Sequence, residues 1–405
     1  MGRAGLTLDG LIVLALAASA LSLLGFLSRQ LPLALFGAAG GDAWFQADLP
    51  RVLANMVDAR SNHYRTKVHP IASIVIHPAV TGLRALWPGT DLQAAMRVTG
   101  LVAAVWIASF YALCRLLGTG RAGAVCFSLL AIGSAAFQFW FAVPETYSFG
   151  SLTLLWVLLV AALAARRPVS DRLLVLASVA SLSITVTNWV AGLALAVVQR
   201  PWRRALGISI VALLIVAALA VVQRFFYQFA KLFFLGSREE AAYMNLTQSG
   251  TLPDKLAGMF WSPLSLPQVL VQATEAPRLN WLTVQLSAPG SGSLAGTLAL
   301  GLWSVLLVAG ALGLARSPKW RDFGKVLALT LAAQVAMHLV YGEETFLYAA
   351  HFLPLLLAVA VFAQHSPLGR LAPAIALLAA ALAAFHNSAA FADAARLLQS
   401  AQPAS

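Results

Sequence analysis

Residues 41–70, GDAWFQADLPRVLANMVDARSNHYRTKVHP, contain the side-chain types that catalyse group transfer, and they follow an apolar run long enough to cross a membrane. A carboxylate held there, such as Asp42, could take a proton from an acceptor hydroxyl or amine. Arg65, Lys67 and His69 are of types that bind a phosphate, with Arg as a planar fork and Lys as a compact charge. A solvated loop whose acids and bases neutralise one another would have the same composition.

Asp48 is a second candidate for the base, six residues after Asp42. It also precedes Leu49–Pro50, and Asp is favoured at a helix N-cap with Pro soon after, so a capping role is the alternative. A D-x-D metal pair is absent. We therefore predict no cofactor, and a divalent ion bound by Asp42 would need a distant partner such as Glu145 or Glu343.

The composition indicates an integral membrane protein. The chain has 405 residues, of which 60% are hydrophobic and 10% charged, with a mean hydropathy of +0.81, whereas soluble domains carry roughly 25% charged residues. The net charge of +12 lies largely on loops between apolar runs, where it signals topology and contacts membrane lipids, so we expect no nucleic-acid partner. The two cysteines, Cys114 and Cys126, allow neither a disulfide framework nor a cysteine metal cluster.

Apolar runs near twenty residues predict an all-α, polytopic fold. The run 8–28 is expected to be a retained first helix. The other runs are 94–117, 122–139, 150–165, 172–199, 205–224, 294–315, 324–340, 346–363 and 371–386. The run 172–199 has basic flanks on both sides and a polar TVTNW stretch near its middle, so we interpret it as two short helices that meet there. This gives about eleven crossings, with the N-terminus inside and the C-terminus outside.

The charges place any chemistry on the outer face. Lys and Arg concentrate on the short loops assigned to the cytoplasm, as the positive-inside rule requires. Every acid except Asp9, Asp171 and Asp322 falls at the other side. The Ala-, Leu- and Arg-rich composition suggests a bacterial inner membrane, with the site on its periplasmic face.

A single transmembrane domain is expected over residues 1–405. Its two long outer segments, 29–93 and 225–293, would cap an active site. Within the first segment, 48–60 and 69–87 have the patterns of helices that lie in the membrane interface or dip into it.

Two further polar clusters lie at outer ends of predicted spans. In FQFWFAVPETYSFG, Glu145 could either begin a helix or line a site. In YGEETFLYAAHF, Glu344 and His351 share a helical face, and a His in an apolar span could bind a phosphate, carry a proton or be structural. The candidate substrate-binding residues are His63, Tyr64, Glu145, Tyr147, Glu344 and His351.

The first cluster resembles the GT-C superfamily of membrane glycosyltransferases, and most closely its branch of lipid A aminoarabinose transferases and protein O-mannosyltransferases. Members of that branch open the first outer loop with Asp-Glu, continue as an amphipathic helix and reach a Lys-Pro-Pro element. This chain has Asp-Ala at 42–43, then DLPRVLANM, then Lys-Val-His-Pro at 67–70. It departs from the pattern at Ala43, where the second acid would stand, and at His69, near the first proline.

The resemblance implies a GT-C-like fold and transfer of a sugar from a polyprenyl-phosphate donor to a lipid, glycan or protein acceptor at the outer face. The family's first acid is its catalytic carboxylate, a role that carries over to Asp42. The family's lysine contacts the donor phosphate, a role that carries over to Lys67, with Arg65 or His69 beside it. Metal dependence stays open.

Two other function classes fit the same topology. A transporter or lipid flippase would show charges within the spans and two related halves, and this sequence has few mid-span charges and no repeated halves. A ligase or polymerase of lipid-linked glycans, or an acyltransferase, would differ in the donor that it accepts.

Overall fold

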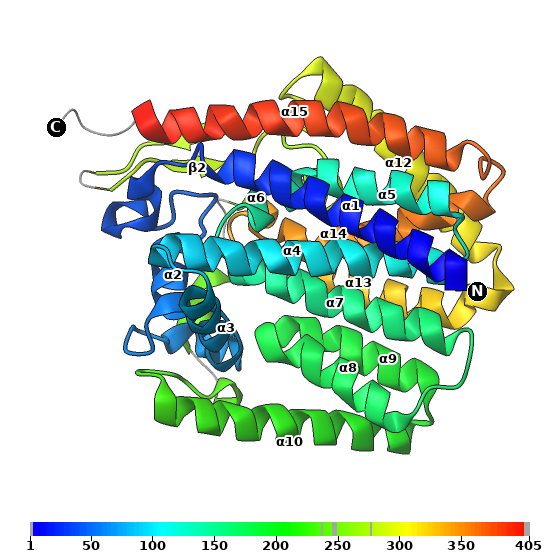
Figure 1. The fold of residues 1–405 in the computed structure, drawn as a ribbon, viewed down its shortest axis with the longest axis horizontal. Coiled ribbons are helices and arrows are strands. Elements are labelled where there is room, and N and C mark those ends of the chain that lie inside the picture. Colours follow the sequence, from blue (N-terminus) through cyan, green and yellow to red (C-terminus); the bar gives the residue numbers. More distant parts are fainter. Residues whose placement is uncertain (1–2, 236–237, 245–248, 276–277, 401–405) are drawn as a thin grey trace.

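The chain folds mostly into long α-helices that run side by side along the long axis of the molecule (Figure 1). The computed structural model describes residues 3–235, 238–244, 249–275 and 278–400. The helices are α1 (Arg3–Ser28), α2 (Leu49–Val57), α3 (Ala72–Leu86), α4 (Asp91–Leu116), α5 (Arg121–Gly133), α6 (Ala135–Phe141), α7 (Thr146–Ala164), α8 (Asp171–Ile184), α9 (Trp189–Gln199), α10 (Trp202–Phe226), α11 (Leu252–Phe260), α12 (Leu294–Ala315), α13 (Arg321–Val340), α14 (Ala349–Val361) and α15 (Ala372–Ser400). The strands β1 (Leu270–Gln272) and β2 (Trp281–Thr283) pair antiparallel.

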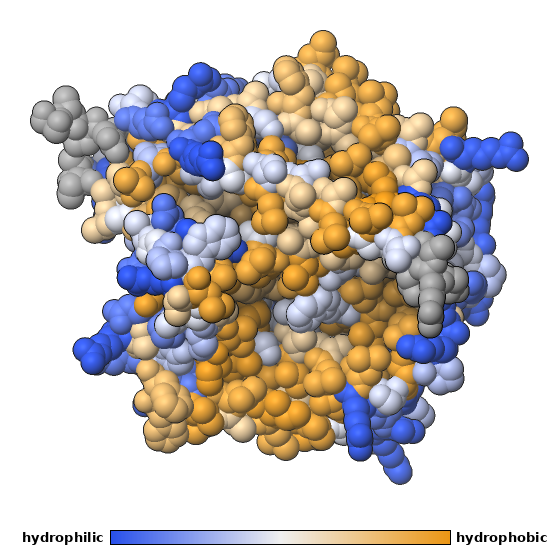
Figure 2. All heavy atoms as spheres, viewed as in Figure 1, coloured by the Kyte–Doolittle hydropathy of each residue, from blue (hydrophilic) through white to orange (hydrophobic). Residues whose placement is uncertain are grey.

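Eight helices in the described part of the chain are long and apolar enough to cross a membrane. The pair α5–α6, bent by 58°, is a ninth if the two form one span. Figure 2 shows apolar side chains over the middle of one face, with hydrophilic ones gathered toward its left and right ends. The protein is therefore an integral membrane protein, as its composition predicts.

The two short helices expected within 172–199 are present as α8 and α9, joined by the 3₁₀ turn η4 (Val186–Asn188). They pack against each other as a hairpin. The two ends of the hairpin lie together, because Arg200 Nε is 2.8 Å from Asp171 Oδ1. Both basic flanks are thus at the same end of the molecule.

The expected count of eleven crossings is not confirmed. Helices α8 and α9 have 14 and 11 residues, so at about 1.5 Å per residue they reach about 21 and 17 Å. The hydrocarbon core of a bilayer is about 30 Å thick. The hairpin therefore enters the bundle without crossing it, and its tip ends at the level of α3 in Figure 1.

The short helices α2 and α3 and the strand β2 gather at one end of the bundle, opposite the N-terminus of α1 (Figure 1). The N-terminus of α1 lies at one end, and α2, α3 and β2 lie with the C-terminal end of α15 at the other (Figure 1). This second end, called the outer end below, holds both segments that were expected to form a cap.

Helix α14 forms the centre of the bundle. In the most apolar 18-residue window of its span, Thr345–His365, 94% of the residues are buried within the protein, and a helix that is buried all round is apolar on all sides. Helix α12 approaches it very closely at Gly310, where a Cβ atom would collide with the carbonyl oxygen of Val359. Small residues allow such close helix contacts in membranes.

We expect Gly310→Ala to destabilise the protein by about 1–3 kcal/mol, because overpacking forces the two backbones apart. Gly301→Ala in the same helix is the matched control, since a Cβ atom added there would meet no other atom within 4 Å. Thermal unfolding in detergent measures both. Equal midpoints for the two variants would contradict the close packing of α12 on α14.

Candidate active site

The loop that carries Asp42 is fixed by two buried aromatic side chains. Trp44 and Phe45 are fully buried. The Trp44 ring stacks on Phe139 with 5.5 Å between centroids, and Phe45 packs edge-on against Phe346 at 5.2 Å. These contacts anchor the loop into α6 and the start of α14's span, so that Asp42 is left at the surface of a cavity.

The backbone of this loop is strained. Asp42, Phe45 and Gln46 all have positive φ, at 62°, 50° and 63°. Asp tolerates this region better than most residues, whereas an aromatic residue rarely adopts it. Such strain persists only where the surrounding packing imposes it, and it clusters at functional sites.

Ala43, which stands where the resembling family has its second acid, is fully buried. Its carbonyl oxygen accepts a hydrogen bond from Leu282 N of β2 at 2.9 Å. Position 43 therefore joins the loop to the β-ribbon and does not line the cavity beside Asp42.

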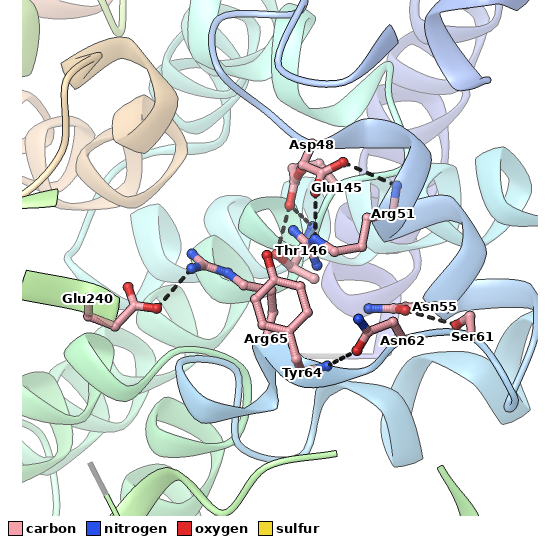
Figure 3. Close-up of polar contacts among 10 residues, drawn as sticks. All are labelled: Asp48, Arg51, Asn55, Ser61, Asn62, Tyr64, Arg65, Glu145, Thr146 and Glu240. Carbon is pink, nitrogen blue, oxygen red and sulfur yellow. Dashed lines mark hydrogen bonds and ion pairs between the residues drawn. The ribbon is translucent and has the colours of Figure 1, made fainter. Parts of the chain in front are cut away.

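Asp48 caps helix α2, the alternative considered from the sequence. Its side chain accepts from Arg51 N, and Pro50 lies in the first turn. Asp48 Oδ2 also pairs with Arg51 Nε at 2.7 Å. Figure 3 shows this pair directed toward Glu145, which caps helix α7 and accepts from Thr146 N at 2.6 Å.

The tip of the α8–α9 hairpin positions the Lys67–His69 element. Val186 N donates to Val68 O at 3.0 Å, and Ile71 N donates to Ser183 O at 3.0 Å. These bonds satisfy backbone groups of the broken helix. They also hold the 3₁₀ turn η3 (Tyr64–Lys67) against the bundle.

A polar cavity of about 420 Å³ opens at the outer end. Its acidic lining residues are Asp42, Asp48, Glu145 and Glu343. Its basic lining residues are Arg51, Arg65 and Arg278. Aromatic side chains, including Tyr64, Tyr147 and Trp281, complete the wall. Polar groups with flat aromatic surfaces suit a sugar-sized polar ligand.

A second cavity, of about 620 Å³, has a largely apolar lining and lies beside the first. It is bordered by the α8–α9 hairpin tip and helix α13, and it contains Lys67 and His351. The residues that line both cavities are Arg65, His69, Tyr147, Tyr341 and Tyr348. A polar chamber and an apolar groove therefore share one wall.

A carboxylate occupies the cationic part of that wall. Glu240, on the 3₁₀ turn η6 (Arg238–Tyr243), has Oε1 2.9 Å from Arg65 Nη1 and 3.0 Å from Lys67 Nζ. Its other oxygen accepts a hydrogen bond from the Tyr341 hydroxyl. Figure 3 shows Arg65 extended toward Glu240 and away from Asp48.

Tyr64 lies under two of the cations. Lys67 Nζ is 5.2 Å and the Arg51 guanidinium carbon 5.7 Å from the centroid of its ring. Cations at this distance are attracted by the ring's electrons. Tyr64 thus links the Asp48–Arg51 pair to the Lys67 element.

The environment of the acids alters their protonation. Loss of hydration by burial, followed by repulsion from Asp48, raises the pKa of Asp42. Burial also raises the pKa of Glu145. For Glu240, burial alone would raise the pKa, but the Tyr341 hydrogen bond and the charge of Arg65 outweigh it and keep the carboxylate ionised. Asp42 is therefore a stronger proton acceptor than Glu240.

His69 is neutral in this site. Burial, followed by the charge of Arg65, lowers its pKa to about 3. Its Nδ1 lies 2.8 Å from the carbonyl oxygen of Ile184, and because a carbonyl only accepts, Nδ1 carries the proton. The other nitrogen is then an acceptor, and the Nδ1 contact helps to hold the hairpin tip.

Two of the expected substrate-binding residues lie outside both cavities. His63 is fully buried, with Nδ1 2.7 Å from Ser73 Oγ. Glu344 accepts from Thr283 Oγ1 at 2.6 Å and from Val284 N at 3.1 Å, and so ties β2 to the bundle. Its neighbour Glu343 faces the polar cavity instead, where Gln46 Nε2 donates to it at 2.9 Å.

The other expected residues reach a cavity. Tyr64 and Glu145 line the polar chamber, Tyr147 lines both cavities, and His351 lines the apolar groove. None of the groups that the structure describes hydrogen-bonds the ring nitrogens of His351. No cluster of three or more His, Cys, Asp or Glu with metal-binding geometry occurs among the described residues.

Glu240 and Tyr341 were not among the residues expected at the site, and Glu343 was expected only as a possible metal partner of Asp42. Glu240 and Arg65 are 175 positions apart, and no local pattern connects them. Arg278 also lines the polar cavity, and its segment is held beside the Asp42 loop by a bond from Leu279 N to Ala39 O at 2.8 Å.

Comparisons with known proteins support the fold. No family model and no curated protein sequence matches the chain. The structure is similar to the crystal structure of the Archaeoglobus fulgidus oligosaccharyltransferase in the apo form, with a TM-score of 0.51 and 11% identity over 97% of this chain and 56% of that chain. The chain thus spans little more than half the length of that protein. The likeness shows a fold shared with that oligosaccharyltransferase, and it indicates neither a branch nor a function.

Proposed function

We propose that the protein is a glycosyltransferase that moves a sugar from a polyprenyl-phosphate donor to an acceptor at the outer membrane face. The observation that carries this proposal is the wall shared by the two cavities. An apolar groove suits a polyprenyl chain, a polar chamber suits a sugar and its acceptor, and the cations Arg65 and Lys67 lie where the two meet. A lipid-linked sugar has the same division of polarity.

The reaction assigned to this site is a displacement at the anomeric carbon. The acceptor hydroxyl or amine attacks that carbon, and Asp42 takes the acceptor's proton. The bond between the carbon and the phosphate oxygen breaks, and its electron pair leaves with the lipid phosphate. Arg65 and Lys67 stabilise the developing negative charge.

The structurally similar oligosaccharyltransferase supports the choice of glycosyl transfer as the reaction, since its name describes such an activity. A direct test uses the purified protein in detergent with a set of radiolabelled polyprenyl-monophosphate sugars and extracted membrane acceptors. Transfer without a sealed vesicle is the expected result, and it separates an enzyme from a transporter. Transfer from diphosphate-linked oligosaccharides alone would favour a glycan ligase instead.

We expect Asp48→Asn to move the acid limb of the kcat/KM profile to lower pH. Asp42 must be ionised to accept a proton, and Asp48 raises its pKa. Removing that charge lowers the pKa of Asp42, so activity persists to a lower pH, while Asn preserves the helix cap.

The pH dependence of transfer measures this shift. Asp91→Asn, which removes an exposed carboxylate outside both cavities, is the control and should leave the profile unchanged. An acid limb that stays in place or moves upward in the Asp48 variant would contradict the role of Asp42 as the base.

A further inference from the structure

The cation site between the two cavities already holds an anion from the same chain. The Glu240 carboxylate bridges Arg65 and Lys67 through one oxygen and accepts from the Tyr341 hydroxyl through the other. All three side chains of the Arg65–Lys67–Glu240 cluster are largely buried, with exposed fractions of 18%, 6% and 14%. A carboxylate bound in this way stands in for two oxygens of a phosphate.

We propose that Glu240 is an internal competitor of the donor, and that the lipid phosphate binds by displacing it from Arg65 and Lys67. The inference rests on the proposed function, because it concerns the same donor site. It adds that Glu240 occupies the cations Arg65 and Lys67 when no donor is bound, and that turn η6 moves when the donor binds.

The geometry supports an exchange in place of simultaneous binding. One oxygen of Glu240 contacts both cations and so occupies the position that a phosphate oxygen would need, and a phosphate added beside it would bring two like charges together. Glu240 and Lys67 both line the apolar groove, so a lipid phosphate entering along the groove meets the carboxylate at the cations.

The attachment of η6 to the rest of the protein allows this movement. Within its described part, η6 is joined to the segment after α13 by a bond from Gly342 N to Tyr243 O at 2.9 Å and by a bridge between Met244 and Tyr341. No regular helix or strand has to open when Glu240 withdraws. Glu240 also keeps two buried cations paired when no donor is bound, and an unpaired buried charge is strongly destabilising.

The first experiment measures binding of a polyprenyl monophosphate to the detergent-purified, full-length protein by native mass spectrometry. We expect Glu240→Gln to lower the dissociation constant at least about tenfold, because the competing charge is gone while the side chain keeps its size. Glu275→Gln removes an exposed outer-face carboxylate that lines neither cavity and should bind like the wild type.

A second measurement uses the unmodified protein, so that it does not depend on how well a variant folds. Hydrogen–deuterium exchange is followed with and without the polyprenyl monophosphate. Displacement of Glu240 predicts faster exchange in the peptide that covers 238–244 when the lipid is present, and the segment 252–260, which forms α11, serves as the internal reference.

The outcomes separate this inference from the proposed function. In one outcome, the wild-type protein binds the lipid in a way that Lys67→Met abolishes, while Glu240→Gln binds it no more tightly and hydrogen exchange at 238–244 is unchanged. That result would overturn the displacement of Glu240 and leave the donor class intact. If neither the wild type nor Glu240→Gln binds the lipid in a way that depends on Lys67, both the displacement of Glu240 and the proposed donor class are overturned. Tighter binding by Glu240→Gln with faster exchange at 238–244 supports both.

Discussion

Asp42→Asn should reduce the rate of sugar transfer by about 10²–10⁴-fold, the range that a positioned general base contributes. Asn has the shape of Asp but cannot take up the proton that the attacking acceptor releases. The side chain of Asp42 lies on the polar cavity, and its loop is held by the buried Trp44 and Phe45, so the substitution leaves the architecture in place.

Single-turnover transfer with saturating donor measures this loss apart from binding. Asp58→Asn is the matched control, because Asp58 ends helix α2 outside both cavities and the same charge is removed. We expect wild-type rates for the control, and an unchanged donor dissociation constant for the Asp42 variant. Transfer within tenfold of the wild-type rate in the Asp42 variant would exclude this residue as the base.

Lys67→Met should weaken binding of the polyprenyl-phosphate donor by at least about 30-fold, which corresponds to roughly 2 kcal/mol for a buried charge contact. Met preserves most of the apolar stem and removes the ammonium group that now contacts Glu240 at 3.0 Å. The phosphate would then meet Arg65 and a carboxylate that has lost one of its two cations. The maximal rate should fall less than the affinity if leaving-group stabilisation is shared with Arg65.

The dissociation constant of the donor at several salt concentrations measures this effect, since a lost ionic contact also reduces the salt dependence. Lys231→Met removes an exposed outer-face lysine and should change neither quantity. The double variant Lys67→Met/Glu240→Gln should bind more tightly than Lys67→Met, because the unneutralised carboxylate is gone. Unaltered affinity in the single variant would place the lipid phosphate elsewhere.

The local features of the site could be predicted from the sequence because they depend on neighbouring residues. The cap formed by Asp48 and the break at Thr185–Trp189 each follow from residue types at fixed spacing. The break has a second role that its sequence does not reveal, since the hairpin tip binds the backbone of Val68. This contact joins segments more than a hundred positions apart.

The remaining features depend on tertiary contacts. Glu240 reaches Lys67 from a distant turn. Glu344 is bonded to Thr283 of β2, which leaves its neighbour Glu343 to line the polar cavity. The sequence does not indicate which of two adjacent acids at a helix start will contact a distant strand. The count of eleven crossings is not confirmed, because the basic flanks and the polar break of 172–199 predict two helices but do not reveal that α8 and α9 are each too short to cross a bilayer.

A cryo-electron microscopy structure of the protein with a polyprenyl monophosphate tests the central claim most directly. The account predicts the prenyl chain in the groove beside α13 and the phosphate within hydrogen-bonding distance of Arg65 and Lys67. Asp42 is predicted to face the phosphate across the polar cavity. A lipid phosphate bound away from Lys67, or a bound lipid separated from the Asp42 cavity by closed protein, would contradict it.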